Sequence, residues 1–276
     1  MVSKISHRLK YRVRTIRDAL FLSRESILRK KFKNDDLNKF ICEQVSQFRE
    51  LGLDWEQAQE VISCVPAEVG RRDSSEHYAL FAAWLHRRPR AEVLEVGTDN
   101  GQFAAFLSAL VPEGRVVTID LPDQDPRYGN ASTPSSHNPS HRGSPPSERT
   151  KFLGRPNITF VEINSVKLAD TVRCFDAIWL DGDHTNPVVS LDISQVLRLV
   201  KPGGLLAMDD IRLPRAAHGV MGYDETYQAL EALKSAGIIK VTLIHKRLTA
   251  QHLYLPENRK YIAVVERVPN PDPFAM

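Results

Sequence analysis

Residues 94–103 read Leu94-Glu95-Val96-Gly97-Thr98-Asp99-Asn100-Gly101-Gln102-Phe103, and the rest of the architecture can be predicted outward from them. An apolar, strand-like run leads into a short turn between two glycines, and a helical pattern begins directly after the second one. Gly97 permits the turn to approach a ligand without a Cβ, and Gly101 permits the helix to begin close to the strand. The stretch therefore predicts a buried strand, a ligand-binding turn and a helix in succession.

The two glycines do not form the Gly-x-Gly-x-x-Gly pattern of dinucleotide-binding turns, because Thr98 and Asp99 occupy the region of the further glycine. Glu95 stands directly before the turn, where an anion would repel a diphosphate but would suit a cationic group such as an amine. The next strand-like run ends at Asp120, whose carboxylate can accept both hydroxyls of a ribose. The turn and the two acids predict a nucleoside that carries an amino group, and they disfavour NAD-dependent oxidation.

Apolar strand-like runs and helical patterns alternate through the chain. The strand-like runs are Glu92–Val96, Val116–Ile119, Ile158–Val161, Ala177–Leu180, Leu205–Met208, Val241–Ile244 and Ile262–Val265. The helical patterns between them are Gln102–Leu110, Val166–Val172, Val188–Leu199 and Glu225–Lys234, and two more cover 36–64 and 73–86, the latter with capping-box spacing at Asp73 and Glu76. Strands that alternate with helices predict an α/β fold with a mostly parallel sheet.

One connection has an unusual composition. Residues 122–149 contain six Pro, six Ser and two Gly, with almost no aliphatic side chains. We expect no packed helix there, and we treat 122–156 as an insertion that forms either a lid over the ligand rim or a passive surface loop. His137 and His141 lie in it and are weak candidates for contact with an acceptor.

The basic charge of the chain is concentrated at its N-terminus. Residues 1–34 hold eleven Lys or Arg against two acids, so this arm carries +9 and the rest of the chain −6 of the total +3. The acidic body argues against a nucleic-acid groove across the main domain. Apolar residues recur in the arm at helical spacing, at Ile5, Leu9, Val13, Ile16 and Leu20. Three interpretations stay open: a helix that packs on its own domain or a second subunit, a surface helix on anionic lipid or an acidic partner, and a cleaved transit peptide.

Composition excludes other classes. No apolar run approaches the roughly 20 residues of a membrane-spanning helix. Cys42, Cys64 and Cys174 are far apart, which argues against a disulfide scaffold and a cysteine zinc site and favours a reducing, cytoplasmic compartment.

With these residues in place, the sequence resembles the class I S-adenosylmethionine-dependent methyltransferases over about residues 73–267. The resemblance is based on Glu95-x-Gly97-x-x-x-Gly101, Asp120, Asp181 and the Lys201-Pro202-Gly203-Gly204 turn, in that order along the chain. It implies a Rossmann-like, doubly wound, seven-stranded, mostly parallel sheet with a reversed last strand, preceded by an N-terminal helical extension. It also implies a set of cofactor-binding residues: Glu95, Gly97, Thr98 and Gly101 at the methionine part, Asp120 at the ribose, Asn164 and Ser165 at the adenine edge, and Asp181. Asn164 departs from the aspartate that is common at its position.

Three carboxylates are expected at one rim of this fold. Asp181 ends the fourth strand, and Asp209 and Asp210 end the fifth, which neighbours it. Clustered carboxylates raise one another's pKa unless a positive group lies between them, and oxygen ligands favour Mg²⁺ or Ca²⁺ over zinc. We therefore expect these three aspartates to bind a divalent cation that positions a substrate hydroxyl and lowers its pKa.

Asp181-Gly182-Asp183-His184 together with Asp209-Asp210 is similar to the metal-dependent O-methyltransferases, including catechol O-methyltransferase and the macrocin and mycinamicin sugar O-methyltransferases. The resemblance implies His184 as general base, with Asp181 also catalytic. Arg71 and Arg72 and, after the Asp-Asp pair, Arg215, His218 and Tyr223 are weaker substrate candidates.

The prediction is a metal-assisted O-methyltransferase for a hydroxyl of a sugar or small secondary metabolite, with S-adenosylmethionine and Mg²⁺ or another divalent cation as cofactors. Residues 1–72 form the arm and helical extension, and residues 73–276 the methyltransferase domain. No nucleic-acid partner is expected. Contact of the arm with a membrane or protein and homo-oligomerisation stay open. The alternatives are a metal-independent methyltransferase acting on nitrogen or RNA, and a non-catalytic cofactor-binding scaffold.

Overall fold

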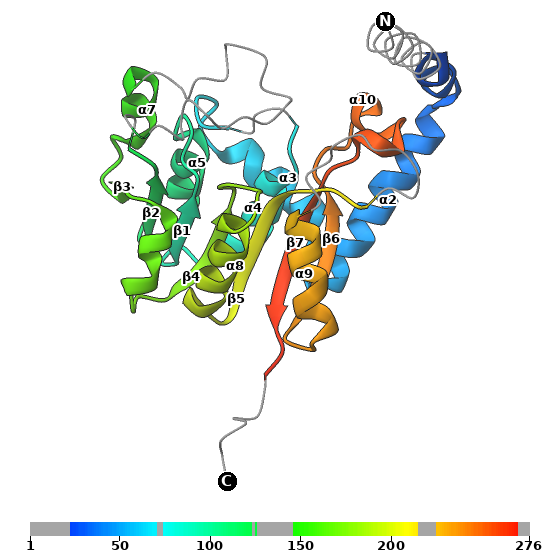
Figure 1. The fold of residues 1–276 in the computed structure, drawn as a ribbon. Coiled ribbons are helices and arrows are strands. Elements are labelled where there is room, and N and C mark those ends of the chain that lie inside the picture. Colours follow the sequence, from blue (N-terminus) through cyan, green and yellow to red (C-terminus); the bar gives the residue numbers. More distant parts are fainter. Residues whose placement is uncertain (1–22, 71–73, 123–124, 126–145, 215–224, 270–276) are drawn as a thin grey trace, which may run out of the picture.

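A computed structural model describes residues 23–70, 74–122, 125, 146–214 and 225–269 (Figure 1). Its centre is a seven-stranded sheet of order β3-β2-β1-β4-β5-β7-β6, in which β7 runs antiparallel to both of its neighbours. The strands are β1 Glu92–Val96, β2 Arg115–Asp120, β3 Ile158–Glu162, β4 Phe175–Leu180, β5 Val200–Ile211, β6 Ile239–His245 and β7 Tyr261–Arg267. The predicted sheet, including its reversed last strand, is confirmed.

The helices match most of the expected patterns. They are α2 Asn34–Glu50, α3 Trp55–Cys64, α4 His77–Leu85, α5 Gln102–Leu110, α7 Pro146–Leu153, α8 Val188–Leu199, α9 Glu225–Ser235 and α10 Ala250–Leu253, with short 3₁₀ helices η2 Ser165–Asp170 and η3 Pro256–Asn258. The pattern over 36–64 forms two helices, because the chain turns at Gly52 with φ 70°. The pattern over 166–172 forms η2, a tighter helix than expected.

Both faces of the sheet are covered, as expected for largely parallel strands. Ala177 and Trp179 of β4 pack with Phe81 and Phe106 of α4 and α5. The alternate residues Ile178 and Leu180 pack with the apolar side chains of α8 and α9 on the other face. Figure 1 shows α8 and α9 together in front of the sheet. The continuous apolar strands therefore reflect burial on two sides, which is the basis of a doubly wound fold.

The carboxyl ends of β1, β4 and β5 lie along one border of the sheet, which we call the carboxyl edge. Val96 pairs with Leu180, Leu180 pairs with Met208, and Ile211 pairs with Tyr261. Because β7 is reversed, its first residue lies at this edge, and His245 at the end of β6 pairs with the same Tyr261. The connection between β6 and β7 therefore lies at the border where β4 and β5 end.

The helical extension shares the core of the sheet domain. Phe48 of α2 and Ala58 of α3 belong to the cluster that contains Ile244 and Ile262. Gln44 donates to the His245 carbonyl at 3.2 Å and accepts from the His245 N–H at 2.9 Å, wholly buried. The described end of the arm, a helix over residues 23–31, is contacted by Tyr254, whose hydroxyl donates to Glu25 at 2.6 Å. The apolar stripe of the arm lies outside the described residues. Among the helices that the structure describes, none is long and apolar enough to cross a membrane.

The start of α4 differs from the expected capping box. Glu76 immediately precedes the helix, and its carboxylate accepts a hydrogen bond from the Trp55 indole at 2.7 Å instead of capping a backbone N–H. The half-buried indole N–H needs an acceptor, and Glu76 supplies it. Asp73, the other member of the expected box, lies outside the described residues, as do Arg71 and Arg72.

The Pro/Ser-rich insertion ends in a helix that composition did not indicate. The expectation of no packed helix is wrong for residues 146–149, which form the first part of α7. Its anchors are Phe152 and Leu153, which follow the window of biased composition and pack at Gly101. His137 and His141 lie outside the described residues, and whether 122–156 acts as a lid stays a prediction.

We expect Gln44→Ala to lower the free energy of unfolding by about 2–4 kcal/mol, because it leaves a buried donor and a buried acceptor of His245 without their partner. Urea unfolding followed by circular dichroism measures the loss. Ser46→Ala, at an exposed position on the same helix, should change the free energy by less than about 0.5 kcal/mol. Equal stability of the two variants would show that α2 contributes little to the folded unit.

Candidate functional site

The turn after β1 is held against the end of β4. Gly97 has φ 97°, and a Cβ on it would overlap the carbonyl oxygen of Asp181. Gly101 has φ 80°, and a Cβ there would lie 2.8 Å from Leu153 Cδ2 of α7. The close approaches that require the two glycines are thus to the protein itself, and a role of Gly97 in binding a ligand stays a prediction. The close approach at Gly97 holds the turn after β1 beside Asp181.

Asp120 organises the same turn. One carboxylate oxygen accepts hydrogen bonds from the backbone N–H groups of Thr98 and Asp99, both at 3.0 Å. The other oxygen accepts from the N–H of Leu121 at 2.8 Å. A carboxylate has about four acceptor positions, so Asp120 can hold the turn and still accept a ribose hydroxyl.

Glu95 is a buried acid among other acids. Its side chain is 1% exposed and accepts from the Thr118 hydroxyl at 2.5 Å, which in turn contacts the Thr98 hydroxyl at 2.6 Å. Burial raises the pKa of Glu95 well above its usual value, Thr118 opposes this, and the charges of Asp181, Asp120 and Asp99 raise the pKa further. We call these four acids, Glu95, Asp99, Asp120 and Asp181, the acid corner. A cationic ligand group would relieve the repulsion within it.

The predicted adenine residues follow β3 at the same edge. Asn164 caps η2 by accepting from the Val166 N–H at 3.0 Å, and Ser165 begins that helix. Near them lies Asp192 of α8, an acid that sequence reasoning did not single out. It is 1% exposed, one oxygen lies 3.4 Å from where a Cβ on Gly182 would be, and burial raises its pKa to about 6. Its place within a regular apolar helix pattern gave no signal.

His184 and Asp181 form a pair at the end of β4. The imidazole Nε2 lies 3.4 Å from Asp181 Oδ1, and the two side chains are 23% and 40% exposed. Burial alone would lower the pKa of His184, but the hydrogen bond and charge of Asp181, with Asp210 and Asp209, raise it above the ordinary value. Because Asp181 holds Nε2, Nδ1 is the nitrogen left to accept a proton. The pair has the arrangement of a base and the acid that orients it.

Two lysines lie between the other two aspartates. Lys246, which follows β6, donates to both Asp209 and Asp210, the latter at 2.6 Å, and Lys260, which precedes β7, donates to Asp210. The Lys246 side chain is 10% exposed and that of Asp209 2%. We call these four residues the lysine–aspartate cluster. Sequence reasoning missed both lysines, although each flanks a strand end that the reversed β7 brings to the carboxyl edge.

The pKa values of the residues in the cluster are shifted in different directions. Although burial raises it, the two lysines hold the pKa of the Asp210 carboxyl well below its usual range. Burial and the charge of Asp181 raise the pKa of Asp209 to about 7, although Lys246 opposes them. Burial lowers the pKa of Lys246, but Asp209, Asp210 and Asp181 raise it above its usual value, so this ammonium stays charged.

The arrangement does not fit the predicted divalent cation at Asp181, Asp209 and Asp210. Both oxygens of Asp210 and one of Asp209 accept hydrogen bonds from lysine ammonium groups, which supply the positive charge expected from a metal. The other oxygen of Asp209 is buried without a partner, but one oxygen does not make a site for Mg²⁺, which takes octahedral oxygen ligands. Among the described residues, no three His, Cys, Asp or Glu side chains are arranged to hold a metal ion.

Backbone strain marks the same region. Asp99 and Asp210 have positive φ, 45° and 54°, which is uncommon for residues other than glycine. Such conformations cost about 1–3 kcal/mol and concentrate at functional sites. Asp99 lies in the turn and Asp210 in the lysine–aspartate cluster, both at the carboxyl edge, and a third such residue, Ser74 with φ 52°, lies just before α4.

Most of the predicted site residues thus meet at this edge. They are Glu95, Gly97, Thr98, Gly101, Asp120, Asn164, Ser165, Asp181, His184, Asp209 and Asp210. Their roles in binding and catalysis stay predictions. Arg215, His218 and Tyr223 lie outside the described residues.

The strand order, the reversed β7 and the acidic turn after β1 define the class I S-adenosylmethionine-dependent methyltransferase fold. Residues 94–211, which hold the turn after β1, the His184–Asp181 pair and Asp209 and Asp210 of β5, match the family described as "Methyltransferase domain". The match covers less than half of the chain, so it shows that this part of the chain is similar to that family. Comparison of the sequence with curated proteins gives no match.

Several solved structures are similar to this chain at low sequence identity. Cofactor-bound Rv0187 from MTB has a TM-score of 0.50 and 16% identity, with 77% of this chain and 88% of that one covered. A presumed O-methyltransferase from Klebsiella pneumoniae has a TM-score of 0.49 and 16% identity over 83% and 89% of the two chains. The Bacillus cereus O-methyltransferase in complex with SAH has a TM-score of 0.48 and 15% identity over 78% and 90%. At these identities the likeness to Rv0187 supports the shared fold alone.

If the lysines supply the charge, Lys246→Ala should lower the free energy of unfolding by about 3–5 kcal/mol, because it leaves buried carboxylates without their counter-charge. Lys201→Ala, which removes a half-exposed ion pair with Asp176, should cost about 0–1 kcal/mol. Chemical unfolding measures both. The same assay with millimolar Mg²⁺ or with EDTA should leave the wild type unchanged, and a Mg²⁺-dependent gain in its stability would restore the cation site.

Proposed function

We propose that this chain is a methyltransferase that transfers a methyl group from S-adenosylmethionine to a hydroxyl oxygen of a small acceptor, such as a sugar or a secondary metabolite. The observation that carries the proposal is the His184–Asp181 pair, which lies at the carboxyl edge directly beside the turn after β1. A hydroxyl must lose its proton when its oxygen is methylated, and a paired imidazole is the usual group to accept it.

The chemistry of the acid corner supports the cofactor. S-adenosylmethionine supplies a methyl group on a positively charged sulfur and also carries an ammonium group. Glu95, Asp99, Asp120 and Asp181 repel one another, and the charges of the other three acids raise the pKa of Glu95. Asp120 fits the ribose, and Asn164 and Ser165 fit the adenine edge. The Rv0187 structure is described as cofactor-bound and the Bacillus cereus structure as a complex with SAH, which agrees with this assignment.

The residues around His184 are suited to proton transfer without a cation. Asp181 orients the imidazole and stabilises its protonated form, with the aspartates of the lysine–aspartate cluster adding to the effect. Lys246 is among the charges that hold the pKa of Asp181 low although burial raises it, so Asp181 stays ionised. We therefore propose His184 as the base, without a divalent cation at the three aspartates. Methylation of nitrogen would not need such a base, because an amine can attack with its own electron pair.

The cofactor assignment predicts that S-adenosylhomocysteine binds with a dissociation constant in the micromolar range, which corresponds to a binding free energy on the order of −8 kcal/mol. Asp120→Ala should weaken it by about 1–3 kcal/mol, since charge-assisted hydrogen bonds are lost. Glu162→Gln changes an exposed acid opposite Asp120 on β3 and should leave the affinity unchanged. Isothermal calorimetry measures all three, and tighter binding of NADH would overturn the assignment.

The assignment of the base predicts that His184→Ala lowers kcat by about 10²–10⁴, the usual contribution of a positioned base, with little change in cofactor affinity. Transfer of a labelled methyl group to a panel of hydroxylated acceptors gives the rate, and mass spectrometry of the product shows whether oxygen carries the methyl group. His86→Ala, at a half-buried histidine beyond the end of α4, is the control and should keep its rate. A fully active His184→Ala variant would remove the base from the mechanism.

The assignment of His184 as the base also predicts how the rate of methyl transfer depends on pH. Only neutral imidazole accepts a proton, so the rate should rise with pH and level off above the pKa of His184, which lies above its ordinary value. Asp181→Asn removes the charge that raises this pKa, so the midpoint should move to lower pH while the plateau falls. A midpoint that stays fixed in Asp181→Asn would assign the titration to another group.

A further inference from the structure

The backbone of Asp99, in the turn after β1, is held from both sides. Asp99 has φ 45°, a left-handed conformation that is uncommon for residues other than glycine. Asp120, at the end of β2, accepts a hydrogen bond from the Asp99 N–H at 3.0 Å. On the other side of the residue, Arg149 Nε donates to the Asp99 carbonyl at 2.9 Å. The strained conformation is therefore supported by one side chain from β2 and one from α7.

Arg149 is itself firmly packed where it makes this contact. It lies in α7 and is only 4% exposed, which is unusual burial for an arginine. Its guanidinium lies 5.3 Å from the centre of the Phe160 ring on β3, within the range of a cation–π contact. Because the side chain is already ordered by this packing, it holds the Asp99 carbonyl without a further loss of its own freedom.

The same helix also contacts the end of the turn. A Cβ on Gly101 would lie 2.8 Å from Leu153 Cδ2 and 3.5 Å from Phe152 Cβ. Arg149, Phe152 and Leu153 are spaced by three and four residues, so they lie on one face of α7. That face therefore contacts the turn at Asp99 and again at Gly101, where α5 begins.

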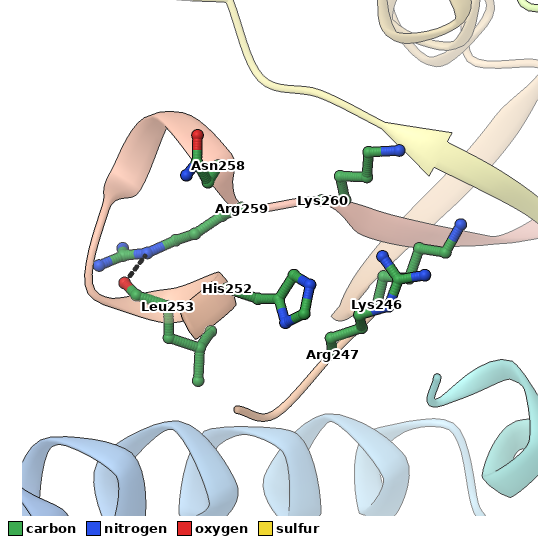
Figure 2. A pocket seen from close by; sticks show the side chains of 7 residues that line it. All are labelled: Lys246, Arg247, His252, Leu253, Asn258, Arg259 and Lys260. Atoms are coloured by element: carbon green, nitrogen blue, oxygen red, sulfur yellow. Dashed lines mark hydrogen bonds between the residues drawn. The ribbon is translucent and has the colours of Figure 1, made fainter. Parts of the chain in front are cut away.

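The other strained aspartate at the carboxyl edge is held in a different way. Lys246 and Lys260, drawn in Figure 2, donate to the carboxylate of Asp210. Those contacts neutralise a charged side chain. The hydrogen bond from Arg149 reaches the backbone carbonyl of Asp99, so it acts on the conformation of the chain. A basic side chain in this position points to a role in keeping the turn in one shape.

We propose that Arg149 is a positioning residue for the cofactor: by holding the Asp99 carbonyl, it keeps the turn after β1 in the conformation that binds S-adenosylmethionine. The inference rests on the proposed function, because it takes this turn as the cofactor site. Arg149 needs no contact with the cofactor for this role. A turn that is already ordered binds more tightly, since less freedom is lost on binding. The contact also couples α7, which lies within residues 122–156, to cofactor binding.

The first experiment compares Arg149→Gln with the wild type by calorimetry with S-adenosylhomocysteine. We expect the variant to bind about tenfold more weakly, the loss that corresponds to one hydrogen bond from a charged donor. Lys151→Gln, at an exposed position on the same helix, is the control and should bind as the wild type does. Equal affinity of Arg149→Gln and the wild type would overturn this inference alone. A wild type that does not bind S-adenosylhomocysteine would overturn the proposed function, so the two failures can be told apart.

A second experiment removes the strain that Arg149 is proposed to offset. Glycine adopts positive φ without a steric penalty, so Asp99→Gly should make the turn less dependent on Arg149. In that background we expect Arg149→Gln to weaken S-adenosylhomocysteine binding less than about twofold. Asp99→Ala removes the same carboxylate but keeps a Cβ, so in this matched background the loss should stay at about tenfold or more. Equal losses in the two backgrounds would show that Arg149 does not act through the conformation of Asp99.

A third experiment needs no variant for its main result. If the contacts of α7 strengthen cofactor binding, the bound cofactor must stabilise the docked α7 by the same factor. We expect S-adenosylhomocysteine to slow hydrogen exchange at the amides of residues 150–153 about tenfold, with little change in α9 on the opposite face of the sheet. Mass spectrometry of peptic fragments measures both. Unchanged exchange in residues 150–153 would overturn the coupling, and a slowing that persists fully in Arg149→Gln would overturn the role of Arg149.

Discussion

A Cβ on Gly97 would overlap the carbonyl oxygen of Asp181, and the rest of the site depends on this close approach. The Asp181 N–H donates to the Val96 carbonyl at 2.8 Å, and the Gly97 N–H donates to the Ile119 carbonyl at 2.9 Å, so the ends of β1, β2 and β4 are tied together. Asp120 then fixes the turn itself through the Thr98 and Asp99 N–H groups. Since His184 is only three residues beyond Asp181, the same contact that positions the turn after β1 also sets the distance from that turn to His184.

The charges at the carboxyl edge are divided between two groups. On the side of β1 and β2, burial and the charges of Asp181, Asp120 and Asp99 raise the pKa of Glu95, although the Thr118 hydroxyl opposes them. On the side of β5 and β7, Lys246 and Lys260 neutralise Asp210 and part of the charge of Asp209. Such a division is costly without ligands, because like charges are held close together in a partly buried place. The proposed cofactor, whose sulfur and ammonium group are positively charged, relieves the repulsion in the first group when it binds.

Much of this architecture could be predicted from the sequence, because apolar strands buried on two faces leave a strong pattern. The predicted helices Gln102–Leu110 and Val188–Leu199 have the observed bounds. The meeting of His184 with Asp181 followed from their adjacency after β4. The lysines were missed because Lys246 lies 37 positions from Asp209 in sequence, and only the reversed β7 brings Lys260 to the same edge. The three aspartates alone indicated that a positive charge lies near them, and the sequence analysis assigned that charge to a metal ion. In the structure, Lys246 and Lys260 supply it.

The lysine–aspartate cluster also bears on how charge moves in the proposed reaction. Methyl transfer removes one positive charge from the sulfur of the cofactor, and the acceptor hydroxyl gives up one proton. When His184 takes that proton, a positive charge appears on the imidazole, beside Asp181 and within the field of Asp209 and Asp210, which raise its pKa. The net charge at the carboxyl edge therefore stays constant while its position changes. A divalent cation in place of Lys246 would add a further positive charge near the imidazole and lower its pKa. With lysines there instead, the acids retain enough negative charge to stabilise the protonated base, so the neutralisation of Asp210 and the basicity of His184 follow from one arrangement.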